Sequence, residues 1–370
     1  MILIKFGILV LNIIYFFIKL FPQRARITFI SRQSNKKSDD ISLLEKEIKK
    51  RDPSIEVVIL CKKIESGFRK KVKYFFHMFK QMYYLATSKV IILDGYCICA
   101  SVLRKKKNTV IIQMWHALGA FKKFGLSIID SEEGTSSKLS KAMKMHKNYD
   151  YILTSSNNTR KYFKDAFGYD INNVIVMPLP RVDYLTDKKH KEVVFKRIIK
   201  KYPQCKTKKN IIYVPTFRKD SENIDKINEL INAIDYSKYN FIIKFHPLSN
   251  LKIKDERVIC DKYFSSIDMM IASDYVITDY SAIVFEASIL EKPLFFYCYD
   301  YDKYYKRRNF YINYKDEMPG VITDSAKDIV NSIENNKFDL EKVKDFRNKY
   351  IELNEGKCTS NLVDFIFKFM

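Results

Sequence analysis

The chain lacks the cysteine and histidine patterns of disulfide-rich and zinc-binding proteins. Its seven cysteines are odd in number, none lies in a Cys-x-x-Cys pair, and only five histidines occur in 370 residues. Zinc sites need clustered thiolates and imidazoles, and a disulfide framework needs paired cysteines. We therefore expect reduced, mostly buried thiols in a reducing compartment. No pair of carboxylates has metal-like spacing either, so no protein-held metal is predicted.

Acidic residues and glycine are also scarce. The chain has 43 Asp and Glu against 66 Lys and Arg, a net charge of +23, and nine glycines. Such an excess indicates an anionic partner, which is nucleic acid, an acidic membrane surface or a phosphorylated substrate; a biased genome composition would produce the same pattern. The basic residues are not interleaved with aromatic residues in a recognised binding motif, so nucleic acid is not expected.

The longest apolar run begins at the N-terminus. Residues 2–21 are interrupted only by Lys5, Asn12 and Lys19, and no small-residue cleavage site follows, so a removable signal peptide is not expected. The run is long enough for a membrane-spanning helix, an in-plane interfacial helix or a buried first helix of the domain. Either membrane reading places the following domain on the cytoplasmic face, because Arg24 and Arg26 come next.

Short apolar runs alternate with helical patterns along the rest of the chain, which predicts an α/β protein with parallel sheets. We expect a membrane-associating helix (1–22) and two Rossmann-like domains (23–189 and 190–370) that face a cleft. The predicted strands are 27–31, 55–60, 90–93, 110–114, 151–154, 174–177, 211–214, 241–245, 258–259, 275–278 and 294–297.

Ligands of parallel sheets bind beyond the carboxyl ends of the strands, so the polar residues found there are the candidates. After the run at 110–114 come Trp115 and His116, followed by Lys122 and Lys123. Histidine can take a proton from a hydroxyl at neutral pH, and the lysines could hold a phosphate. The alternative is a core histidine that packs beside a core tryptophan.

Two further strand ends carry cations. Arg218 follows Pro215-Thr-Phe and could reach a phosphate with its forked donors, although a surface arginine is the simpler interpretation. Lys244 and His246 alternate along the strand predicted at 241–245, so they would share one face of it. A cation and an imidazole there predict a diphosphate site, with a solvated sheet edge as the alternative.

The most specific segment surrounds Thr278 and Asp279. Ser281 stands where a helix N-cap would be, and the free N–H groups of a first helical turn bind anions. Glu286 follows inside the helix, where it could accept the two hydroxyls of a ribose. Asp279 could orient the loop or favour the helix dipole.

With these segments in this order, the chain resembles the CDP-glycerol:poly(glycerophosphate) glycerophosphotransferase family, which primes and polymerises wall teichoic acid and related capsular polymers. The resemblance covers about residues 110–360. The matching segments are Trp115-His116, Pro215-Thr-Phe-Arg218, Lys244-Phe-His-Pro247, Ile277-Thr-Asp-Tyr-Ser281 with Glu286, and Pro180-Arg181-Val-Asp183. One departure is Leu179-Pro180-Arg181, where the family usually has Gly-Pro-Arg.

The resemblance implies a GT-B-like transferase on the cytoplasmic face of the cell membrane. It would move glycerol or ribitol phosphate from CDP-glycerol or CDP-ribitol to an undecaprenyl-linked or polymeric glycan, releasing CMP. His116 would be the general base, and His246, Arg218 and Ser281 would hold the diphosphate. Lys244, Thr278 and Asp279 complete the expected donor site, and Glu286 would bind the ribose; Arg181 is a weaker candidate for acceptor or phosphate contact. Mg²⁺ could accompany the diphosphate.

Two rival readings stay open. A sugar-nucleotide glycosyltransferase of cell-envelope polysaccharide synthesis would share the GT-B architecture. A basic membrane-binding module without catalysis would keep its full function after His116→Ala and His246→Ala. The length of the chain holds one catalytic module, which favours a priming or single-addition enzyme over a long polymerase.

Overall fold

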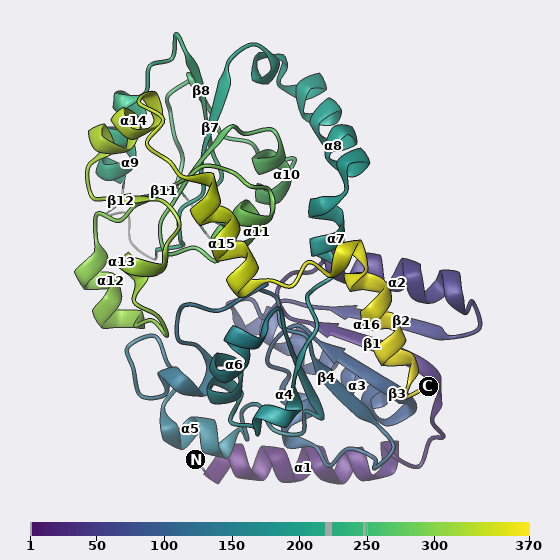
Figure 1. Cartoon of the computed structure of the whole chain (residues 1–370). Helices are drawn as coiled ribbons and strands as arrows, with labels where there is room; N and C mark the ends of the chain where they lie inside the picture. Colours follow the sequence, from purple (N-terminus) through teal and green to yellow (C-terminus); the bar gives the residue numbers. More distant parts are fainter. Residues whose placement is uncertain (1, 219–223, 247–248, 250) are drawn as a thin grey trace. The chain divides into compact units, whose positions relative to one another are not determined.

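The computed structural model describes residues 2–218, 224–246, 249 and 251–370. The chain divides into two compact units (Figure 1): residues up to 183 together with 352–370, and residues 184–351. Each unit is built on one six-stranded sheet in which every pairing is parallel. The expected α/β class with two parallel-sheet domains is confirmed, whereas the cleft expected between them stays a prediction.

The sheet of the first unit has the order β2-β1-β3-β4-β5-β6. Its strands are almost continuously apolar because both faces are covered, and Ile27, Ile91 and Ile112 are fully buried. The strands are β1 (Arg24–Ser31), β2 (Glu56–Cys61), β3 (Ser88–Leu93), β4 (Val110–Gln113), β5 (Tyr151–Thr154) and β6 (Val174–Val176).

Helices cover this sheet. α3 packs on β1 and β3, α6 packs on β5 and β6, and α2 packs against α16. The α-helices are α1 (Ile2–Ile18), α2 (Asp39–Arg51), α3 (Phe68–Thr87), α4 (Ile98–Val102), α5 (Ser137–Ala142), α6 (Arg160–Phe167), α7 (Arg181–Thr186), which crosses the boundary between the units, and α16 (Cys358–Phe367).

The sheet of the second unit has the order β12-β11-β10-β7-β8-β9. Its buried core is apolar and aromatic, with Tyr213, Phe241 and Phe295 fully buried. The strands are β7 (Lys209–Tyr213), β8 (Tyr239–Ile243), β9 (Val258–Ile259), β10 (Tyr275–Thr278), β11 (Leu294–Tyr297) and β12 (Val321–Thr323).

The helices of the second unit follow the same logic. α14 packs on β11, β12 and α9, while α11 packs on β10, α10 and α15. The α-helices are α8 (Lys188–Lys201), α9 (Ile224–Ala233), α10 (Ser266–Ile271), α11 (Ile283–Ile289), α12 (Tyr301–Arg308), α13 (Tyr314–Glu317), α14 (Ala326–Glu334) and α15 (Leu340–Tyr350).

The structure changes three expectations. The boundary expected between 189 and 190 lies at 183/184, and residues 352–370 belong to the first unit instead of the second. β12, of three residues, was not predicted, although β6 and β9, which are as short or shorter, were. β8 ends at Ile243, so Lys244 and His246 lie in the loop beyond the strand and do not share a strand face.

The first helix, α1, is docked on the first unit by one side only. Tyr15 is fully buried, the Asn12 side-chain amide donates to the carbonyl of Val102 (3.1 Å), and Lys106 donates to the carbonyl of Phe21 (2.6 Å). The large apolar side chains Phe6, Leu9, Ile13, Phe16 and Phe17 are exposed, so the interpretation as a buried core helix is wrong. None of the helices in the described part of the chain is long and apolar enough to cross a bilayer.

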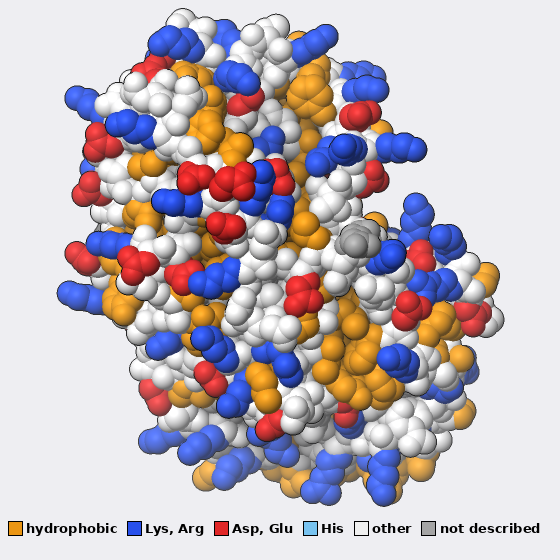
Figure 2. Space-filling view, in the orientation of Figure 1, with side chains coloured by type: hydrophobic (Ala, Val, Ile, Leu, Met, Phe, Trp, Pro, Cys, Tyr) orange, Lys and Arg blue, Asp and Glu red, His pale blue; other side chains and the backbone are white. Residues whose placement is uncertain are grey.

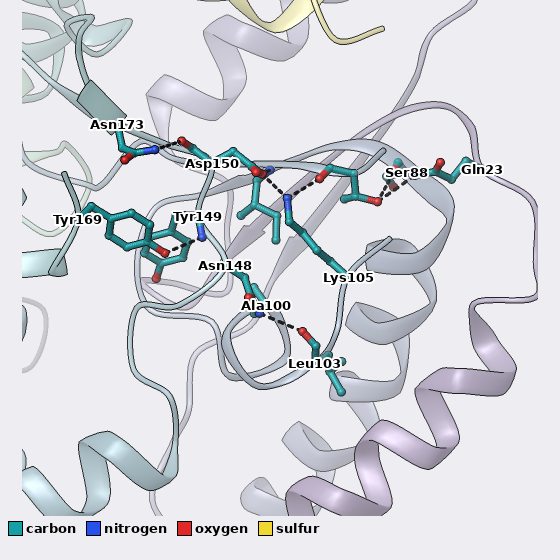
Figure 3. A network of polar contacts seen from close by, with 12 residues as sticks. Gln23, Ser88, Ala100, Leu103, Lys105, Asn148, Tyr149, Asp150, Tyr169 and Asn173 are labelled. Atoms are coloured by element: carbon teal, nitrogen blue, oxygen red, sulfur yellow. Dashed lines mark hydrogen bonds and ion pairs between the residues drawn. The ribbon is translucent and has the colours of Figure 1, made fainter. Parts of the chain in front are cut away.

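A polar network supports the loop on which α1 rests (Figure 3). Lys105 binds the carboxylate of Asp150 and the carbonyl of Thr109, and Asn148 donates to the carbonyls of Ala100 and Leu103 (2.9 Å each). The carbonyl of Thr109 lies just before β4, and those of Ala100 and Leu103 lie at the carboxyl end of α4, where helical carbonyls would otherwise be unpaired. The loop after α4 is therefore a fixed platform for α1.

Candidate active site

Three neighbouring strands of the first sheet bring His116, Asp94 and Gln33 together. They follow β4, β3 and β1, and carboxyl ends of adjacent parallel strands meet at one edge. The His116 Nδ1 lies 2.9 Å from the backbone carbonyl of Asp94 and 3.1 Å from the side-chain amide of Gln33. His116 therefore lies at the carboxyl edge of the sheet, as predicted, and its role as a base stays a prediction.

The hydrogen bond to Asp94 defines the tautomer of His116. A carbonyl only accepts, so Nδ1 carries the proton and donates it, and the lone pair is on Nε2. The Gln33 Nε2 lies 3.1 Å from Nδ1, so with Nδ1 protonated the Gln33 amide must be turned over to present its oxygen. Burial lowers the pKa of His116 to about 4, the Asp94 carbonyl works against this, and the positive charge of Arg181 lowers the pKa further. The imidazole is neutral at pH 7, as a general base must be.

The backbone that presents His116 is strained. Trp115 has φ of 61°, a left-handed conformation that is rare for a bulky residue. Its N–H donates to Gln113 Oε1 (3.1 Å), and its ring lies 4.2 Å from the ring of His116 and 4.9 Å from that of Phe124, centroid to centroid. The tryptophan packs on aromatic rings, as the interpretation as a core residue predicted. Its left-handed backbone also sets the position of His116 at the end of the strand, as the interpretation as a functional site requires.

Asp94, whose backbone carbonyl contacts His116, has a buried carboxyl group. The side chain of Asp94 is 4% exposed, and its Oδ1 has no hydrogen-bond partner among the described residues. Burial raises the pKa of Asp94 to about 6, which Ser31 opposes and Asp40 reinforces. A buried carboxyl group with a raised pKa is typical of functional sites.

Arg181 lies at the same edge and contacts groups of the protein there, while its contact with an acceptor or a phosphate stays a prediction. Its guanidinium forms an ion pair with Asp40, its backbone N–H donates to the other oxygen of Asp40 (2.8 Å), and Nη2 donates to the carbonyl of His116 (3.1 Å). These contacts give Arg181 a structural role. Lys122 and Lys123 are half-buried on the loop after Phe121, and their contact with a phosphate stays a prediction.

In the second unit, Arg218 is enclosed by two carboxylates. Its Nε and Nη2 donate to both oxygens of Asp300 (2.8 and 2.9 Å), and Nη1 donates to Asp279 Oδ2 (2.6 Å) and to the carbonyl of Thr216 (3.1 Å). Burial by itself would lower the pKa of the guanidinium, but Asp279 and Asp300 outweigh it and raise the pKa. Arg218 ties together the loops after β7, β10 and β11.

Asp279 is the centre of this arrangement. It is fully buried, its Oδ1 accepts from the N–H of Thr216 (2.8 Å), and its carbonyl accepts from the hydroxyl of Tyr314 (2.7 Å). Thr278, also fully buried, donates its hydroxyl to the carbonyl of Val214 (2.8 Å). Both residues order the edge, as the loop-orienting reading of Asp279 predicted; their contact with a donor stays a prediction.

Lys244 and His246 separate after β8. Lys244 is buried and donates to Asp261 Oδ2 (2.9 Å) and to the carbonyls of Asp261 and Phe264 (2.9 and 2.6 Å). Burial alone would raise the pKa of Asp261, but Lys244, Tyr202 and backbone N–H groups hold it below the usual value. The three protons of Lys244 are thus bound within the protein, and its contact with a donor stays a prediction.

His246 is directed elsewhere. It lies against Phe217, with 5.3 Å between ring centroids, and lines a cavity of about 20 Å³ with Thr216, Arg218 and Tyr299. The next residue of the motif, Pro247, lies outside the described residues. The loops after β7, β8 and β11 therefore place His246 next to Arg218, as expected for one donor-binding edge.

The helix after β10 begins later than predicted. α11 starts at Ile283 with Ala282 as its N-cap, and Ser281 Oγ accepts only a long hydrogen bond from the N–H of Ile283 (3.4 Å). The prediction that Ser281 is the N-cap is wrong. Glu286 lies in the first turn of α11 and is 4% exposed. Its role toward a ribose stays a prediction.

Besides a groove of about 570 Å³ that α9 and the start of α14 line, two larger open grooves of the second unit can hold a ligand. One, of about 770 Å³, lies at the carboxyl ends of β11 and β12 and is lined by residues 298–303, Lys315 and residues 322–324. The other, of about 730 Å³, lies where β12 begins, near Gly320. Since ligands bind at the carboxyl ends of parallel strands, the first groove is the candidate.

Comparison with known proteins decides the family. The model of the CDP-glycerol:poly(glycerophosphate) glycerophosphotransferase family matches residues 13–368. The chain belongs to this family. It is therefore an enzyme, and its family transfers polyol phosphates from CDP-activated donors in teichoic acid synthesis.

Curated relatives of this glycerophosphotransferase agree. The chain is 33% identical over 360 residues to a teichoic acid ribitol-phosphate primase of Bacillus spizizenii, covering 94% of this chain and 92% of the relative. It is 34% identical over 300 residues to a teichoic acid glycerol-phosphate primase of Bacillus subtilis, covering 78% and 76%. A teichoic acid poly(ribitol-phosphate) polymerase of Bacillus spizizenii is 31% identical, with 55% of its length covered.

Solved structures show the fold of the glycerophosphotransferase. The wall teichoic acid polymerase TagF aligns with a TM-score of 0.77 at 22% identity, over 98% of this chain and 97% of the solved chain. A UDP-GlcNAc 2-epimerase from Neisseria meningitidis aligns with a TM-score of 0.62 at 13% identity, over 93% and 99%. At these identities the likeness establishes a GT-B-like fold and nothing finer.

Sequence reasoning missed the carboxylates of both edges. Asp40, Asp94, Asp261 and Asp300 each lie next to a predicted site residue in the glycerophosphotransferase. Asp94 could have been found by the rule that polar residues at the carboxyl ends of strands are candidates, because it directly follows β3. Asp40 lies in a helix and Asp261 follows a two-residue strand, so no pattern marks them.

Proposed function

We propose that in this glycerophosphotransferase His116 is the general base on the acceptor and that the strand-end loops of the second unit bind the CDP-polyol. Nε2 of His116 takes the proton from an acceptor hydroxyl, the oxygen attacks the β-phosphorus, the bond to the CMP phosphate breaks, and CMP leaves. The supporting observation is the Nδ1 hydrogen bond to Asp94, which leaves a neutral imidazole with its lone pair on Nε2. Positioning and fixed charges supply the remaining catalysis.

A CMP-release assay tests the reaction and the residues together. Purified protein is incubated with CDP-glycerol or CDP-ribitol and a lipid-linked disaccharide or teichoic acid acceptor. His116→Asn and His246→Ala are expected to lose about 10²–10⁴-fold in turnover while keeping the wild-type melting temperature. Repeating the assay with EDTA tests whether Mg²⁺ accompanies the diphosphate.

Other outcomes of this assay discriminate between the readings. CMP release from only one donor identifies the polyol. Consumption of a sugar nucleotide with no CMP release from either CDP-polyol would establish the glycosyltransferase reading instead. Undiminished turnover in His116→Asn would exclude His116 as the base.

We also propose that this chain adds one or a few units, as a priming enzyme does. The likeness to a ribitol-phosphate primase, which covers 94% of this chain and 92% of the relative, supports the proposal. Mass spectrometry of products at excess donor is expected to show one or two added polyol phosphates. A ladder of many units would contradict the priming role.

The enzyme is proposed to work on the cytoplasmic face of the cell membrane, with α1 lying in the interface. Residues exposed on α1 and just after it are large and apolar and recur at helical spacing: Phe6, Leu9, Ile13, Phe16, Phe17 and Leu20. A helix with one docked face and one apolar face suits an in-plane position. Nothing else in the described protein covers that face.

The neighbouring helix α3 extends the same surface. α3 packs against α1, and Phe68, Phe75 and Phe76 are exposed beside the exposed cations Arg69, Lys70, Lys71 and Lys73. Figure 2 shows Lys and Arg side chains with hydrophobic ones along the bottom of the first unit, where Figure 1 places α1. Apolar side chains among cations suit an anionic lipid surface.

Vesicle sedimentation tests the membrane proposal. The double variant Phe16→Ser, Phe17→Ser is expected to bind phosphatidylglycerol vesicles at least about tenfold more weakly, since each buried aromatic side chain contributes about 1.5–3 kcal/mol. Tyr263→Ser, at an aromatic residue of the second unit that is 77% exposed, is the control and should bind normally. Unchanged binding of the double variant would reject α1 as the anchor.

A further inference from the structure

We propose that the buried Asp40–Arg181 ion pair is a positioning element for the transfer reaction, which holds the Trp115–His116 turn through the backbone carbonyl of His116. The proposal rests on the proposed role of His116 as the base. It assigns Arg181, which sequence reasoning had placed in phosphate or acceptor contact, to the orientation of the histidine instead.

The geometry of the pair is that of a rigid clamp. Asp40, 1% exposed in the first turn of α2, accepts from the backbone N–H of Arg181 with Oδ1 (2.8 Å) and from Nε with Oδ2 (2.9 Å). Nη2 reaches both Oδ2 of Asp40 and the carbonyl of His116 (3.1 Å). Asp40 binds both the backbone N–H and the guanidinium of Arg181, so the side chain has little freedom to move. The carbonyl that the guanidinium binds is therefore fixed too.

The turn at His116 needs such a clamp. Trp115 is at φ of 61°, a conformation that a bulky residue leaves unless its surroundings hold it. On the Trp115 side the turn is held by the Gln113 side chain and by aromatic packing. On the other side, the carbonyl of His116 is held by Arg181. Loss of this bond would let the imidazole move from its position beside the Asp94 carbonyl.

Arg181 also contributes charge. Arg181 from α7 is the charged group whose charge acts on the imidazole; Asp94, at the end of β3, contacts the ring through its backbone carbonyl, and Asp40 of α2 binds Arg181. Burial is the main cause of the lowered pKa of His116, and the positive charge of Arg181 lowers it further. Removal of that charge should therefore raise the pKa, so that His116 becomes protonated at a higher pH.

Steady-state kinetics over a range of pH test the proposal on the full chain. Arg181→Gln is expected to lower kcat at least about tenfold with little change in the KM of the CDP-polyol, and to move the acid limb of kcat/KM to higher pH. Arg181→Lys keeps the charge without the fork, so it should lower kcat but keep the wild-type acid limb. NMR titration of the histidine ring signals should show the same shift for His116 without relying on turnover.

A matched control separates positioning from general stability. Arg160 in the same unit donates to the carbonyls of Val174 (2.9 Å) and Ile171 (2.7 Å), far along the chain from His116. Arg160→Gln should lower the melting temperature while leaving the acid limb unchanged. If Arg181→Gln does not fold, Asp40→Asn and Arg181→Lys carry the test, and both should lower kcat more than they raise KM.

The outcomes also separate this inference from the proposed function. An inactive His116→Asn together with an Arg181→Gln enzyme of wild-type kcat and pH profile would overturn only the clamp. An active His116→Asn would overturn the role of the base, and the clamp with it. A shift of the acid limb equal in Arg160→Gln and Arg181→Gln would also reject the clamp.

Discussion

Buried cations of this enzyme are paired with carboxylates that lie far away in the sequence. Arg181 pairs with Asp40, Lys244 with Asp261, and Arg218 with Asp279 and Asp300. A buried charge without a partner is strongly unfavourable, so each cation at a strand end had to find one. These ion pairs fix the conformation of the loops at the strand ends. The same loops position the imidazoles of His116 and His246.

The Arg218 pair leads to a first prediction. Arg218→Met leaves the fully buried Asp279 without its cation, so the free energy of unfolding should fall by about 3–5 kcal/mol. Urea unfolding measures this. Arg257→Met, which breaks an exposed ion pair with Asp255, is the control and should cost about 0–1 kcal/mol. Equal losses in the two variants would contradict a structural role for Arg218.

His146 leads to a second prediction, on pH. It is 3% exposed, and burial, assisted by Arg32, lowers its pKa to about 4. Between pH of about 6.5 and 4 the unfolded chain binds this proton and the folded chain does not, so stability is full above that range and falls as the pH falls through it.

His146→Asn removes this titration, and asparagine tolerates the left-handed backbone at this position (φ 59°). The loss of unfolding free energy between pH 7 and 4 should become smaller by about 2–3 kcal/mol, at about 1.4 kcal/mol per pKa unit. Chemical denaturation at both pH values measures it. The same loss in wild type and variant would show that His146 does not titrate in this range.

At the scale of elements, the segment Pro180–Asp183 joins distant parts of the first unit. Arg181 binds α2 and the His116 turn, and two residues later Asp183 accepts from the backbone N–H groups of Cys358 and Thr359 (2.8 Å each). These N–H groups belong to the first turn of α16, where no intrahelical acceptor is available. A carboxylate supplied 175 residues earlier therefore caps the last helix.

Asp183→Ala gives a third prediction. The loss of the cap should cost about 1–2 kcal/mol, and amide hydrogen exchange should accelerate in α16. The control is Asp187→Ala, which removes the cap of α8, where Asp187 accepts from the N–H of Lys189 (2.9 Å). Faster exchange there should stay within α8. If the amide hydrogens of α16 exchange as slowly in Asp183→Ala as in the wild type, the capping role is contradicted.

At the scale of the whole molecule, the net charge of +23 supports the proposed membrane surface. Screening shortens the reach of these charges, because the Debye length falls from about 10 Å at 0.1 M salt to about 3 Å at 1 M. Binding to anionic vesicles should weaken at least about tenfold over this range, whereas binding to neutral vesicles, driven by α1, should not weaken.

Sedimentation with both kinds of vesicle checks this fourth prediction. The double variant Lys70→Gln, Lys71→Gln on α3 should reduce the salt dependence, since each basic residue near the surface contributes about 1 kcal/mol. Lys327→Gln with Lys337→Gln, on the second unit, is the charge-matched control. Equal salt dependence in both double variants would show that α3 does not contribute to binding.

Much of the fold was predictable because its signals are local. Four strands, including Tyr151–Thr154 and Leu294–Tyr297, have their predicted bounds, and most others differ by one to three residues at an end. Parallel strands covered on both faces must be apolar throughout, and the helices between them repeat every 3.6 residues, so short windows reveal both. His116 was found because its position at a strand end is also local.

The sequence by itself determined the α/β class, the two parallel sheets, the family, and the strand ends that carry His116 and His246. Only the tertiary structure decided which side chains are structural. Arg218 meets Asp279 and Asp300 across 61 and 82 residues, and the chain returns to the first unit at 352–370. Hydrophobic periodicity records how each element is buried, but the partner of a buried charge depends on which elements become neighbours, and no local pattern encodes that.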